Sequence, residues 1–343
     1  MIMIKVGIIG CGSIGVKRHI AEYSKLENVE LVAFCDLVKE RAEAQQEIYG
    51  GKVYEDYTEL LADESVEAVS VCTPNYKHAE ISIAALEAGK HVLCEKPMGI
   101  TLDEMDRMIE AEKKSGKQLM VGHNQRLIKE HQVARDYIAE GRLGRIYSFR
   151  TAFGHGGPEG WSVDGKDSWF FKKDQAVMGA MGDLGVHKAD LIRYILDEEV
   201  VDVGGFISKE AKEFSDVDDN AVCILRTESN VIGTLQASWA FYGEEDNSTV
   251  IYGDKGVLNL LDDPEYSFIF TSSTGEVVRE NYGGIQTNDD EGQSKKSFVM
   301  EAFIDALVKD ERVPVTAEDA KKSVEIILNA FESDRTNKII TEE

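Results

Sequence analysis

After three residues the chain reads Ile4-Lys5-Val6-Gly7-Ile8-Ile9-Gly10-Cys11-Gly12-Ser13-Ile14-Gly15, an apolar run that passes directly into Gly-x-Gly-x-x-Gly. The run predicts a buried parallel strand. The first glycine of the motif permits a tight turn, the second lets backbone approach a pyrophosphate, and the third lets a helix pack on the strand. The N-terminus of that helix presents unpaired N–H groups and the positive end of its dipole. In this context the motif predicts a dinucleotide site, although an isolated glycine motif also occurs in ordinary turns.

A second apolar run, residues 29–35, ends at Asp36, about 20 residues beyond the last glycine of the motif. A carboxylate at this position accepts hydrogen bonds from the ribose hydroxyls of adenosine and repels a 2′-phosphate. The two residues that follow are apolar, where an NADP site usually carries an arginine. Lys39 and Arg41 are close by, but we interpret them as the first turn of a solvated helix. The sequence therefore favours NAD over NADP as the cofactor.

The composition is that of a soluble, acidic, globular protein of 343 residues, with 43% apolar and 29% charged residues. Because the formal net charge is −25, nucleic acid and anionic membranes are poor partners. Acidic clusters at 216–219, 244–246, 289–291 and 342–343 indicate a solvating surface. No apolar run approaches the roughly 20 residues that span a bilayer, and Met1 leads straight into the first strand. We therefore expect a cytoplasmic protein without a signal peptide.

The five cysteines and seven histidines show no metal-binding pattern. No two cysteines have Cys-x-x-Cys spacing, and no histidine motif completes a site. Four cysteines lie in or beside strand-like runs, and Cys11 lies within the glycine motif. We therefore expect no structural metal, and thiols that are reduced and mostly buried.

The first third of the chain alternates predicted strands with predicted helices, which indicates a doubly wound parallel sheet. After the first strand, strands are expected at 29–36, 68–72, 91–94 and 118–121, and helices at 13–26, 39–49, 57–62, 77–88 and 101–116. A chain of 343 residues exceeds a usual single core, so two domains are the default. We assign residues 1–123 to an NAD-binding domain and residues 124–343 to a substrate-binding and oligomerisation domain.

Beyond residue 123 the strands no longer alternate with long helices, which predicts an α+β domain with a large, mostly antiparallel open sheet. A helix is expected to about residue 141, and two helices, 296–309 and 317–336, end the chain. The expected strands are 145–151, 200–208, 221–227, 231–240, 248–252, 257–261, 267–271 and 277–280. Because so few helices can cover only one face of this sheet, we expect a homo-oligomer, a dimer or a tetramer, through the other face.

Two loops of the first domain leave the carboxyl ends of strands, where ligands bind in such sheets. The first, Thr73-Pro74-Asn75-Tyr76-Lys77-His78, is either a cofactor contact or an ordinary turn. The second, Glu95-Lys96-Pro97, places a charged pair after an apolar strand, which is costly unless the pair has a partner or a task. Its lysine either directs an ammonium toward whatever lies over the nicotinamide or forms a surface salt bridge with the neighbouring glutamate.

The second domain carries Gly179-Ala180-Met181-Gly182-Asp183-Leu184-Gly185-Val186-His187-Lys188-Ala189-Asp190, a glycine-rich approach to a helix that runs to about residue 196. Asp183 and His187 are four residues apart and so share a helix face. An imidazole beside a carboxylate suits proton transfer near neutral pH, although such pairs are more often structural. Residues 155–169, rich in glycine and aromatic side chains, form either a substrate wall or a long surface loop.

Taken together, these motifs resemble the glucose–fructose oxidoreductase/inositol dehydrogenase/MocA (Gfo/Idh/MocA) family of NAD(P)-dependent oxidoreductases over nearly the whole chain. The resemblance rests on the glycine motif with His19, Cys72-Thr73-Pro74-Asn75 with His78, Glu95-Lys96-Pro97, Trp169, and Asp183-Leu184-Gly185-Val186-His187. It implies a Rossmann fold in the first domain, catalytic positions at Lys96, Asp183 and His187, and an often cis bond before Pro97. Residues 178–182 depart from the family's run of consecutive glycines, which affects the pocket shape and the substrate more than the chemistry.

The resemblance implies oxidation of a secondary hydroxyl on a cyclic polyol or sugar, with hydride transfer to nicotinamide. In this mechanism His187 takes the hydroxyl proton, Asp183 orients the imidazole, and Lys96 donates to the same oxygen. The expected cofactor positions are Gly10, Gly12, Ser13, Ile14, Gly15, Asp36, Thr73, Pro74, Asn75, His78, Glu95 and Lys96. The expected substrate contacts are Arg126, His155, Trp169, Asp183 and His187.

Two other functions are compatible with these residues. One is an enzyme of the same fold that retains NAD and reduces and reoxidises it within one cycle, giving net hydrolysis or epimerisation. The other is a non-catalytic, NAD-linked sensor. A sensor has no need of Lys96, Asp183 and His187 together, which makes it the weaker alternative.

Overall fold

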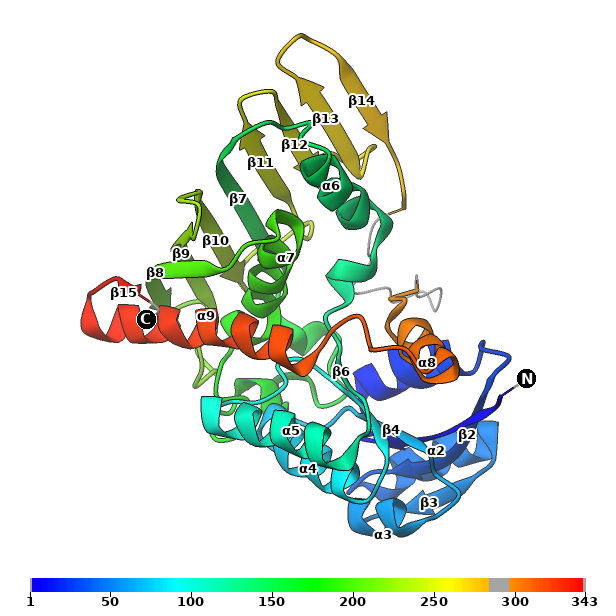
Figure 1. The fold of residues 1–343 in the computed structure, drawn as a ribbon. Coiled ribbons are helices and arrows are strands. Elements are labelled where there is room, and N and C mark those ends of the chain that lie inside the picture. Colours follow the sequence, from blue (N-terminus) through cyan, green and yellow to red (C-terminus); the bar gives the residue numbers. More distant parts are fainter. Residues whose placement is uncertain (1, 284–295, 342–343) are drawn as a thin grey trace.

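The computed structural model describes residues 2–283 and 296–341, which form two β-sheets with helices around them (Figure 1). The acidic residues at 289–291 and 342–343 lie outside the described residues. One sheet has six parallel strands and the other has nine mostly antiparallel strands. Both predicted sheet types are therefore confirmed.

The parallel sheet has the strand order β3-β2-β1-β4-β5-β6. Its strands are β1 (Ile4–Ile9), β2 (Val29–Cys35), β3 (Lys52–Tyr54), β4 (Ala68–Val71), β5 (His91–Cys94) and β6 (Leu119–Val121). β1 pairs with both β2 and β4, so the strand order switches direction at β1. Ligands of such sheets bind outside the carboxyl ends of the strands at this switch. The sequence pattern missed β3, since three residues are too short for a periodic signal.

The helices of this half differ from expectation mainly at the first one. The expected helix at 13–26 contains a π-helical turn, Gly15–Ile20, and ends early with α1 (Ala21–Tyr23). The Thr101 hydroxyl accepts a hydrogen bond from the Glu104 N–H at 3.2 Å and so caps the N-terminus of the helix expected at 101–116. The other helices are α2 (Lys39–Tyr49), α3 (Tyr57–Ala62), α4 (His78–Glu87) and α5 (Leu102–Ser115), with a 3-10 turn at Asn75–Lys77.

The large sheet has the strand order β14-β13-β12-β11-β7-β10-β9-β8-β15. β10 pairs with β7 in parallel, and the other neighbouring strands pair antiparallel. Exposed and buried side chains alternate along β9, as expected for a sheet with one covered face. The strands are β7 (Ile146–Gly154), β8 (Val200–Ser208), β9 (Asn220–Thr227), β10 (Ile232–Ser238), β11 (Thr249–Gly253), β12 (Gly256–Leu260), β13 (Phe268–Ser272), β14 (Val277–Glu280) and β15 (Ile340–Thr341).

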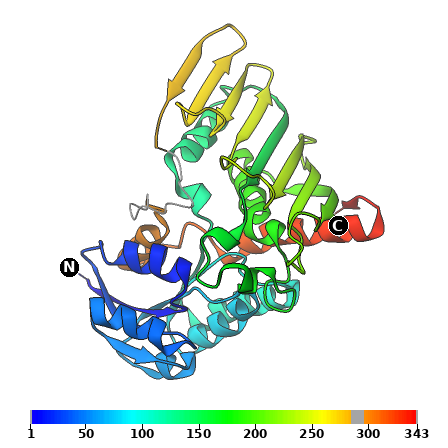
Figure 2. The same cartoon turned by 180° about the vertical axis from the view of Figure 1, so that it is seen from behind.

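Three helices, α6 (Lys129–Ala139), α7 (Val186–Leu196) and α9 (Ala317–Thr336), lie on one face of the large sheet (Figure 1). Seen from behind, the opposite face carries no helix of the described residues (Figure 2). α8 (Val299–Lys309) packs instead against α1 of the parallel-sheet half. The domain boundary at residue 123 stays a prediction. Shorter helical turns lie at Asn124–Leu127, Pro158–Gly160, Gly165–Asp167, Trp169–Phe171 and Met181–Gly185.

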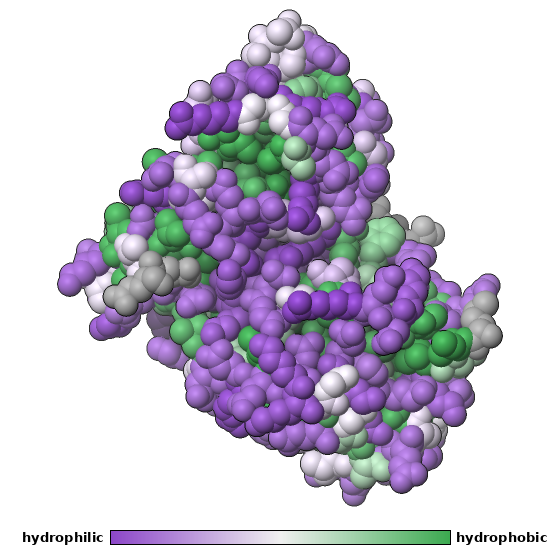
Figure 3. Space-filling model, in the orientation of Figure 1, coloured by the Kyte–Doolittle hydropathy of each residue, from purple (hydrophilic) through white to green (hydrophobic). Residues whose placement is uncertain are grey.

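The face of the molecule in Figure 3 is mostly hydrophilic, in keeping with the net charge of −25. Among the described residues, no helix has the length and apolar character that crossing a membrane requires. All five cysteines are free and four of them are buried, as the sequence predicts. Within residues 2–283 and 296–341, no three His, Cys, Asp or Glu side chains are placed to hold a metal ion.

Candidate active site

A cavity of about 950 Å³ opens outside the carboxyl ends of β1 and β4, between the two sheets. Loops that follow the six strands of the parallel sheet line one side, and the start of α7 lines the other. Every predicted site residue lines this cavity except Gly15 and Arg126. Sequence reasoning missed a third contribution, from Ser297 to Met300 near the end of the chain. The Ser297 hydroxyl and N–H both donate to the Glu22 carboxylate, which fixes this segment on the first half.

The glycine loop fits a bound pyrophosphate. Gly10 has a φ of +99°, and a Cβ there would lie 2.6 Å from the Cys72 carbonyl oxygen, so only glycine is tolerated. A Cβ on Gly15 would lie 2.1 Å from the Gly10 oxygen, so this glycine permits close packing and has no need to line the cavity. A Cβ on Gly12 would meet no atom within 4 Å. Gly12 therefore leaves open space where backbone can approach a phosphate.

Asp36 lies at the adenosine end of the cavity, next to the glycine loop. Its two carboxylate oxygens accept hydrogen bonds from the N–H groups of Cys11 and Val38, each at 2.8 Å. The carboxylate is thus held at the place where a dinucleotide fold binds ribose hydroxyls. Together with the open Gly12 loop, this arrangement fits NAD.

The Glu95-Lys96-Pro97 loop is built around a partly buried carboxylate, that of Glu95. The bond between Lys96 and Pro97 is cis, as the resemblance implies. Glu95 accepts hydrogen bonds from His19 Nε2 at 3.0 Å and from the Lys96 N–H at 3.1 Å. Burial raises the pKa of Glu95, but His19 and the Lys96 charge outweigh it and lower that pKa to about 2. Glu95 therefore supports the loop, and its pairing with His19 replaces the alternative of a surface salt bridge with Lys96.

The Thr73–His78 loop is fixed by its polar side chains. The two ring nitrogens of His78 lie 2.7 Å from the Pro97 oxygen and 2.8 Å from the Thr73 oxygen. Burial lowers the pKa of His78, whereas the two carbonyl oxygens raise it, and through these contacts the ring links the two loops. Asn75 is buried, and its Nδ2 donates to the Ala176 oxygen at 3.1 Å. This loop is consequently more than an ordinary turn, because it joins the two halves at the cavity.

The Lys96 ammonium crosses to the second half and meets Asp183. Its Nζ lies 2.7 Å from the carboxylate Oδ1 and 2.9 Å from the main-chain oxygen of Asp183. The other carboxylate oxygen accepts a hydrogen bond from Trp239 Nε1 at 3.1 Å. Burial raises the pKa of Asp183, but Lys96, His155 and Trp239 outweigh it, so the carboxyl stays ionised at neutral pH. Sequence reasoning missed Trp239, which lies 56 residues further along the chain.

A buried aspartate, Asp218, holds the turn that carries Asp183. Its carboxylate accepts hydrogen bonds from Gly179 N–H at 2.6 Å and Met181 N–H at 2.8 Å. A Cβ on Gly179 would lie 1.9 Å from the main-chain oxygen of Asp218, so this glycine permits the close approach. Burial raises the pKa of Asp218 to about 6. No local pattern marks this residue, because its partners are 37 and 39 residues away.

His187 lines the same cavity, but the expectation that Asp183 orients its ring is wrong. Within the described residues no hydrogen bond joins the two side chains, and the Asp183 oxygens accept instead from Lys96 and Trp239. Asp183 also lies in the π-helical turn Met181–Gly185, whose wider geometry removes the expected α-helical neighbour relation. Packing holds the ring instead, with the His123 and Phe153 rings at centroid distances of 6.0 Å and 5.9 Å.

The imidazole of His187 is neutral at physiological pH. Burial and the charge of Lys96, followed by those of His123 and Lys188, hold its pKa well below the usual value. Its Nδ1 is buried and has no hydrogen-bond partner in the described part of the chain. A neutral imidazole in this cavity can accept a proton from a bound hydroxyl.

Residues 158–176 of the second half, which we name the strap, line the cavity and contact the first half at Ser13 and Asn75. The Ser13 hydroxyl donates to the Trp161 oxygen at 3.0 Å, and Asn75 binds Ala176 at the other end. The Trp169 ring stacks on Phe170 at 3.9 Å. The predicted segment 155–169 is therefore a cavity wall and not a free surface loop. His155 also lines the cavity, with its Nδ1 accepting from the Gly157 N–H at 2.9 Å.

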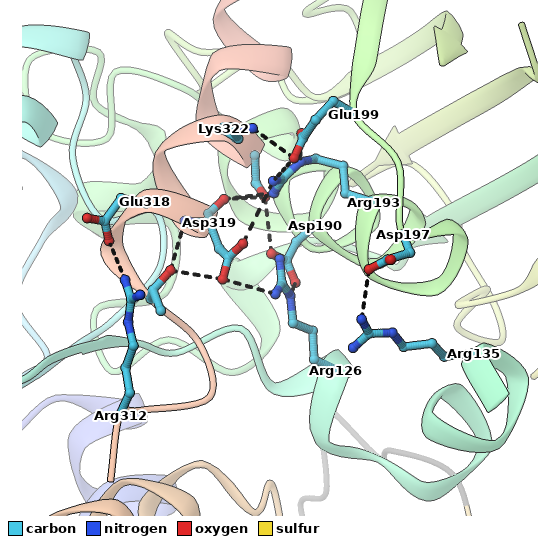
Figure 4. A network of polar contacts seen from close by, with 12 residues as sticks. Arg126, Arg135, Asp190, Arg193, Asp197, Glu199, Arg312, Glu318, Asp319 and Lys322 are labelled. Atoms are coloured by element: carbon cyan, nitrogen blue, oxygen red, sulfur yellow. Dashed lines mark hydrogen bonds and ion pairs between the residues drawn. The ribbon is translucent and has the colours of Figure 1, made fainter. Parts of the chain in front are cut away.

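The predicted substrate contact of Arg126 is not supported, because its guanidinium faces an ion-pair network away from the cavity (Figure 4). Arg126 lies 2.7 Å from Asp190 and 3.4 Å from Asp319. Arg193 forms a bidentate pair with Glu199 and also donates to the Asp319 main-chain oxygen. The network joins α7 to the start of α9, and so stabilises the helix that carries His187.

Comparisons with known proteins agree with this geometry. A family model described as "Oxidoreductase family, NAD-binding Rossmann fold" matches residues 4–123, and the "GFO/IDH/MocA C-terminal domain" model matches residues 131–259. The chain belongs to the GFO/IDH/MocA family. It is therefore an oxidoreductase with an NAD-binding Rossmann fold, as its motifs indicate.

Members of this family are similar along most of the chain. Myo-inositol 2-dehydrogenase of Thermotoga maritima is 30% identical over 278 residues, which are 79% of each chain. Levoglucosan dehydrogenase of Pseudarthrobacter phenanthrenivorans is 30% identical over 80% of this chain and 78% of its own. A levoglucosan dehydrogenase structure with NADH and levoglucosan has a TM-score of 0.84 at 26% identity, covering 98% of this chain and 99% of its own.

Proposed function

We propose that this protein oxidises a secondary hydroxyl of a sugar or a cyclic polyol, with NAD as the hydride acceptor. The observation that carries the proposal is the Lys96–Asp183 ion pair, which lies in one cavity with the glycine loop and His187. Relatives named inositol 2-dehydrogenase, levoglucosan dehydrogenase and D-glucoside 3-dehydrogenase support this substrate class. They differ in substrate, so the proposal extends to the class and not to one compound.

In the proposed reaction Lys96 and His187 act on the same hydroxyl. The Lys96 ammonium donates a hydrogen bond to the substrate oxygen and stabilises the negative charge that develops there. The neutral His187 accepts the hydroxyl proton. When bound, NAD accepts the hydride from the carbinol carbon. Asp183 is assigned a positioning role through Lys96, since its carboxylate holds the ammonium and not the imidazole.

The aromatic residues of the strap support a ring-shaped substrate. Trp161 and Trp169 both contact Phe170, and all three line the cavity. Aromatic faces bury the C–H faces of a sugar or polyol ring, while its hydroxyls remain available for polar contacts. We therefore propose that this wall orients the ring toward Lys96.

The test is absorbance at the NADH wavelength after the protein and NAD are mixed with a panel of inositols, levoglucosan, glucosides and free aldoses. A time-dependent rise with at least one class is expected. The same panel with boiled protein is the control for chemical reduction. No rise with any member, although NAD binds and exchanges freely, would contradict the proposal.

A second candidate is an enzyme that retains NAD and reoxidises it in each cycle, and the strap is the observation that favours it. Its contacts with Ser13 and Asn75 join the two halves at the cavity and in this candidate hold NAD in the site. This candidate predicts NAD that copurifies, fails to exchange with labelled NAD, and gives no net NADH. Free exchange together with net NADH would contradict it.

We also propose a homo-oligomer that forms through the uncovered face of the large sheet. Phe206, Val222, Ile224 and Ile232 are exposed there, with Phe206 78% exposed and paired in register with Val222. Exposed apolar patches of this kind mark protein interfaces. Light scattering is expected to give a multiple of 38.1 kDa, and Ile224→Lys is expected to lower it. A wild-type mass of one chain would contradict this part of the proposal.

A further inference from the structure

Asp164, on the strap, forms an ion pair with the first half at the adenosine end of the cavity. Its Oδ1 lies 2.8 Å from Nη2 of Arg41, which is in the first turn of α2. Both residues line the cavity together with Asp36. The sequence predicts Arg41 on a solvated helix face, whereas the structure places it half-buried at the edge of the cofactor site.

Arg41 lies where it could contact the 2′-phosphate, the group that distinguishes NADP from NAD. Asp36 marks where a dinucleotide fold binds the ribose hydroxyls, and NADP carries a phosphate on one of them. An arginine beside this position is the group that usually accepts that phosphate. Lys39, the other cation in the first turn of α2, is paired with Glu43 and Glu55. Arg41 is therefore the cation of this turn that lines the cavity, and the strap holds it.

We propose that Asp164 is a specificity residue that excludes cofactors with a 2′-phosphate. It does so by holding the Arg41 guanidinium and by adding a second carboxylate to that of Asp36. An exposed ion pair contributes little to stability. Its effect here is on charge, because Asp164 neutralises part of the Arg41 charge and repels a dianionic phosphate beside it. The proposal rests on the NAD site and is independent of which substrate is oxidised.

The test compares two nucleotides that lack nicotinamide, so that binding is read without turnover. Calorimetry measures the affinity of the full-length protein for adenosine 5′-monophosphate and for adenosine 2′,5′-bisphosphate. Asp164→Asn is expected to tighten the bisphosphate about tenfold, as one freed charge-assisted hydrogen bond allows, and to leave the monophosphate within about twofold. The ratio of the two affinities is the quantity that tests specificity.

Two further variants distinguish the effect of the Asp164–Arg41 ion pair from the effect of removing any negative charge from the strap. Asp167→Asn removes the same charge from the strap, three residues along, where the carboxylate lines the cavity and has no ion pair within the described residues. It is expected to change the ratio less than twofold. Combining Asp164→Asn with Arg41→Met is expected to abolish the gain, since the gain requires the guanidinium.

Three outcomes would overturn the proposal. They are an unchanged ratio in Asp164→Asn, an equal gain in Asp167→Asn, or a gain that survives Arg41→Met. If the wild type binds neither nucleotide, the NAD site itself fails, and with it the proposal. If it binds the monophosphate yet gives no NADH with any sugar or polyol, only the proposed substrate class fails.

Discussion

The two ends of the cavity are built in different ways. The cofactor end consists of short contiguous motifs, each following one strand of the parallel sheet, and its main residues lie within the first 97 positions. The substrate end is assembled across long distances, since Lys96 meets Asp183 from 87 residues away and Trp239 reaches the same carboxylate from the large sheet. Local sequence therefore specifies the first end, and tertiary packing specifies the second. Variants at the cofactor end are expected to lose NAD affinity, whereas variants at the substrate end are expected to lose kcat.

The largest expected effect is at the substrate end. His187→Ala removes the proton acceptor, so kcat is expected to fall about 10² to 10⁴-fold, the usual contribution of a general base. NADH affinity, measured by its fluorescence, is expected to change less than about twofold, because the glycine loop is untouched. Full turnover in this variant would remove His187 from the mechanism.

At the cofactor end, two glycine variants separate folding from binding. Gly12→Ala adds a Cβ that meets no protein atom, so thermal stability is expected to hold while NAD affinity falls about tenfold or more. Gly10→Ala adds a clash with the Cys72 oxygen at a positive φ, so both stability and affinity are expected to fall. Calorimetry and thermal unfolding measure the two quantities. Equal effects of both variants on stability would contradict this account of the loop.

A smaller effect is expected from the second contact of Asp183. Trp239→Phe keeps most of the ring but removes the N–H that donates to the carboxylate at 3.1 Å. A hydrogen bond to a charged group contributes about 1.5–3 kcal/mol, so a loss of roughly tenfold in kcat is expected. NAD affinity is expected to stay within about twofold. A loss of NAD affinity without a loss in kcat would show that the two ends are not separable.

The smallest predicted effect is on pH dependence. His187 must be neutral to accept a proton, and its pKa lies well below the usual value, so kcat/KM is expected to hold down to below pH 6.5 and to fall at lower pH. Lys188→Met removes one of the nearby charges that lower this pKa. The pH at which kcat/KM falls on the acid side is therefore expected to move up toward pH 6.5 in this variant.

Lys173→Met, at an exposed position, is the control and should leave that pH unchanged. Thermal unfolding of both variants checks that the buried change has not disrupted the fold. A fall in kcat/KM that moves to lower pH in Lys188→Met would contradict the assignment.

The sequence predicted the order and type of most elements, because strand–helix alternation and period-two patterns are local. The expected cofactor residues Gly10, Gly12 and Asp36 line the cavity, because each lies in the loop that follows its strand, and their contact with NAD stays a prediction. The sequence did not predict which group Asp183 contacts. That depends on a π-helical turn held by Asp218, and neither has a local signature. The sequence also did not predict that Arg126 pairs with Asp319, because the two residues are far apart in the chain. Arg126 was therefore expected to contact the substrate.

The central claim is that Lys96, held by Asp183 across the two halves, acts on the substrate hydroxyl. The most direct measurement is NADH absorbance in a single turnover, with the wild type and Lys96→Met each saturated with NAD and the best substrate of the panel. We expect a rapid rise in the wild type and a rise at least a hundredfold slower in Lys96→Met. Equal rates at saturation would contradict the claim and leave the Lys96–Asp183 pair as a structural link between the two halves.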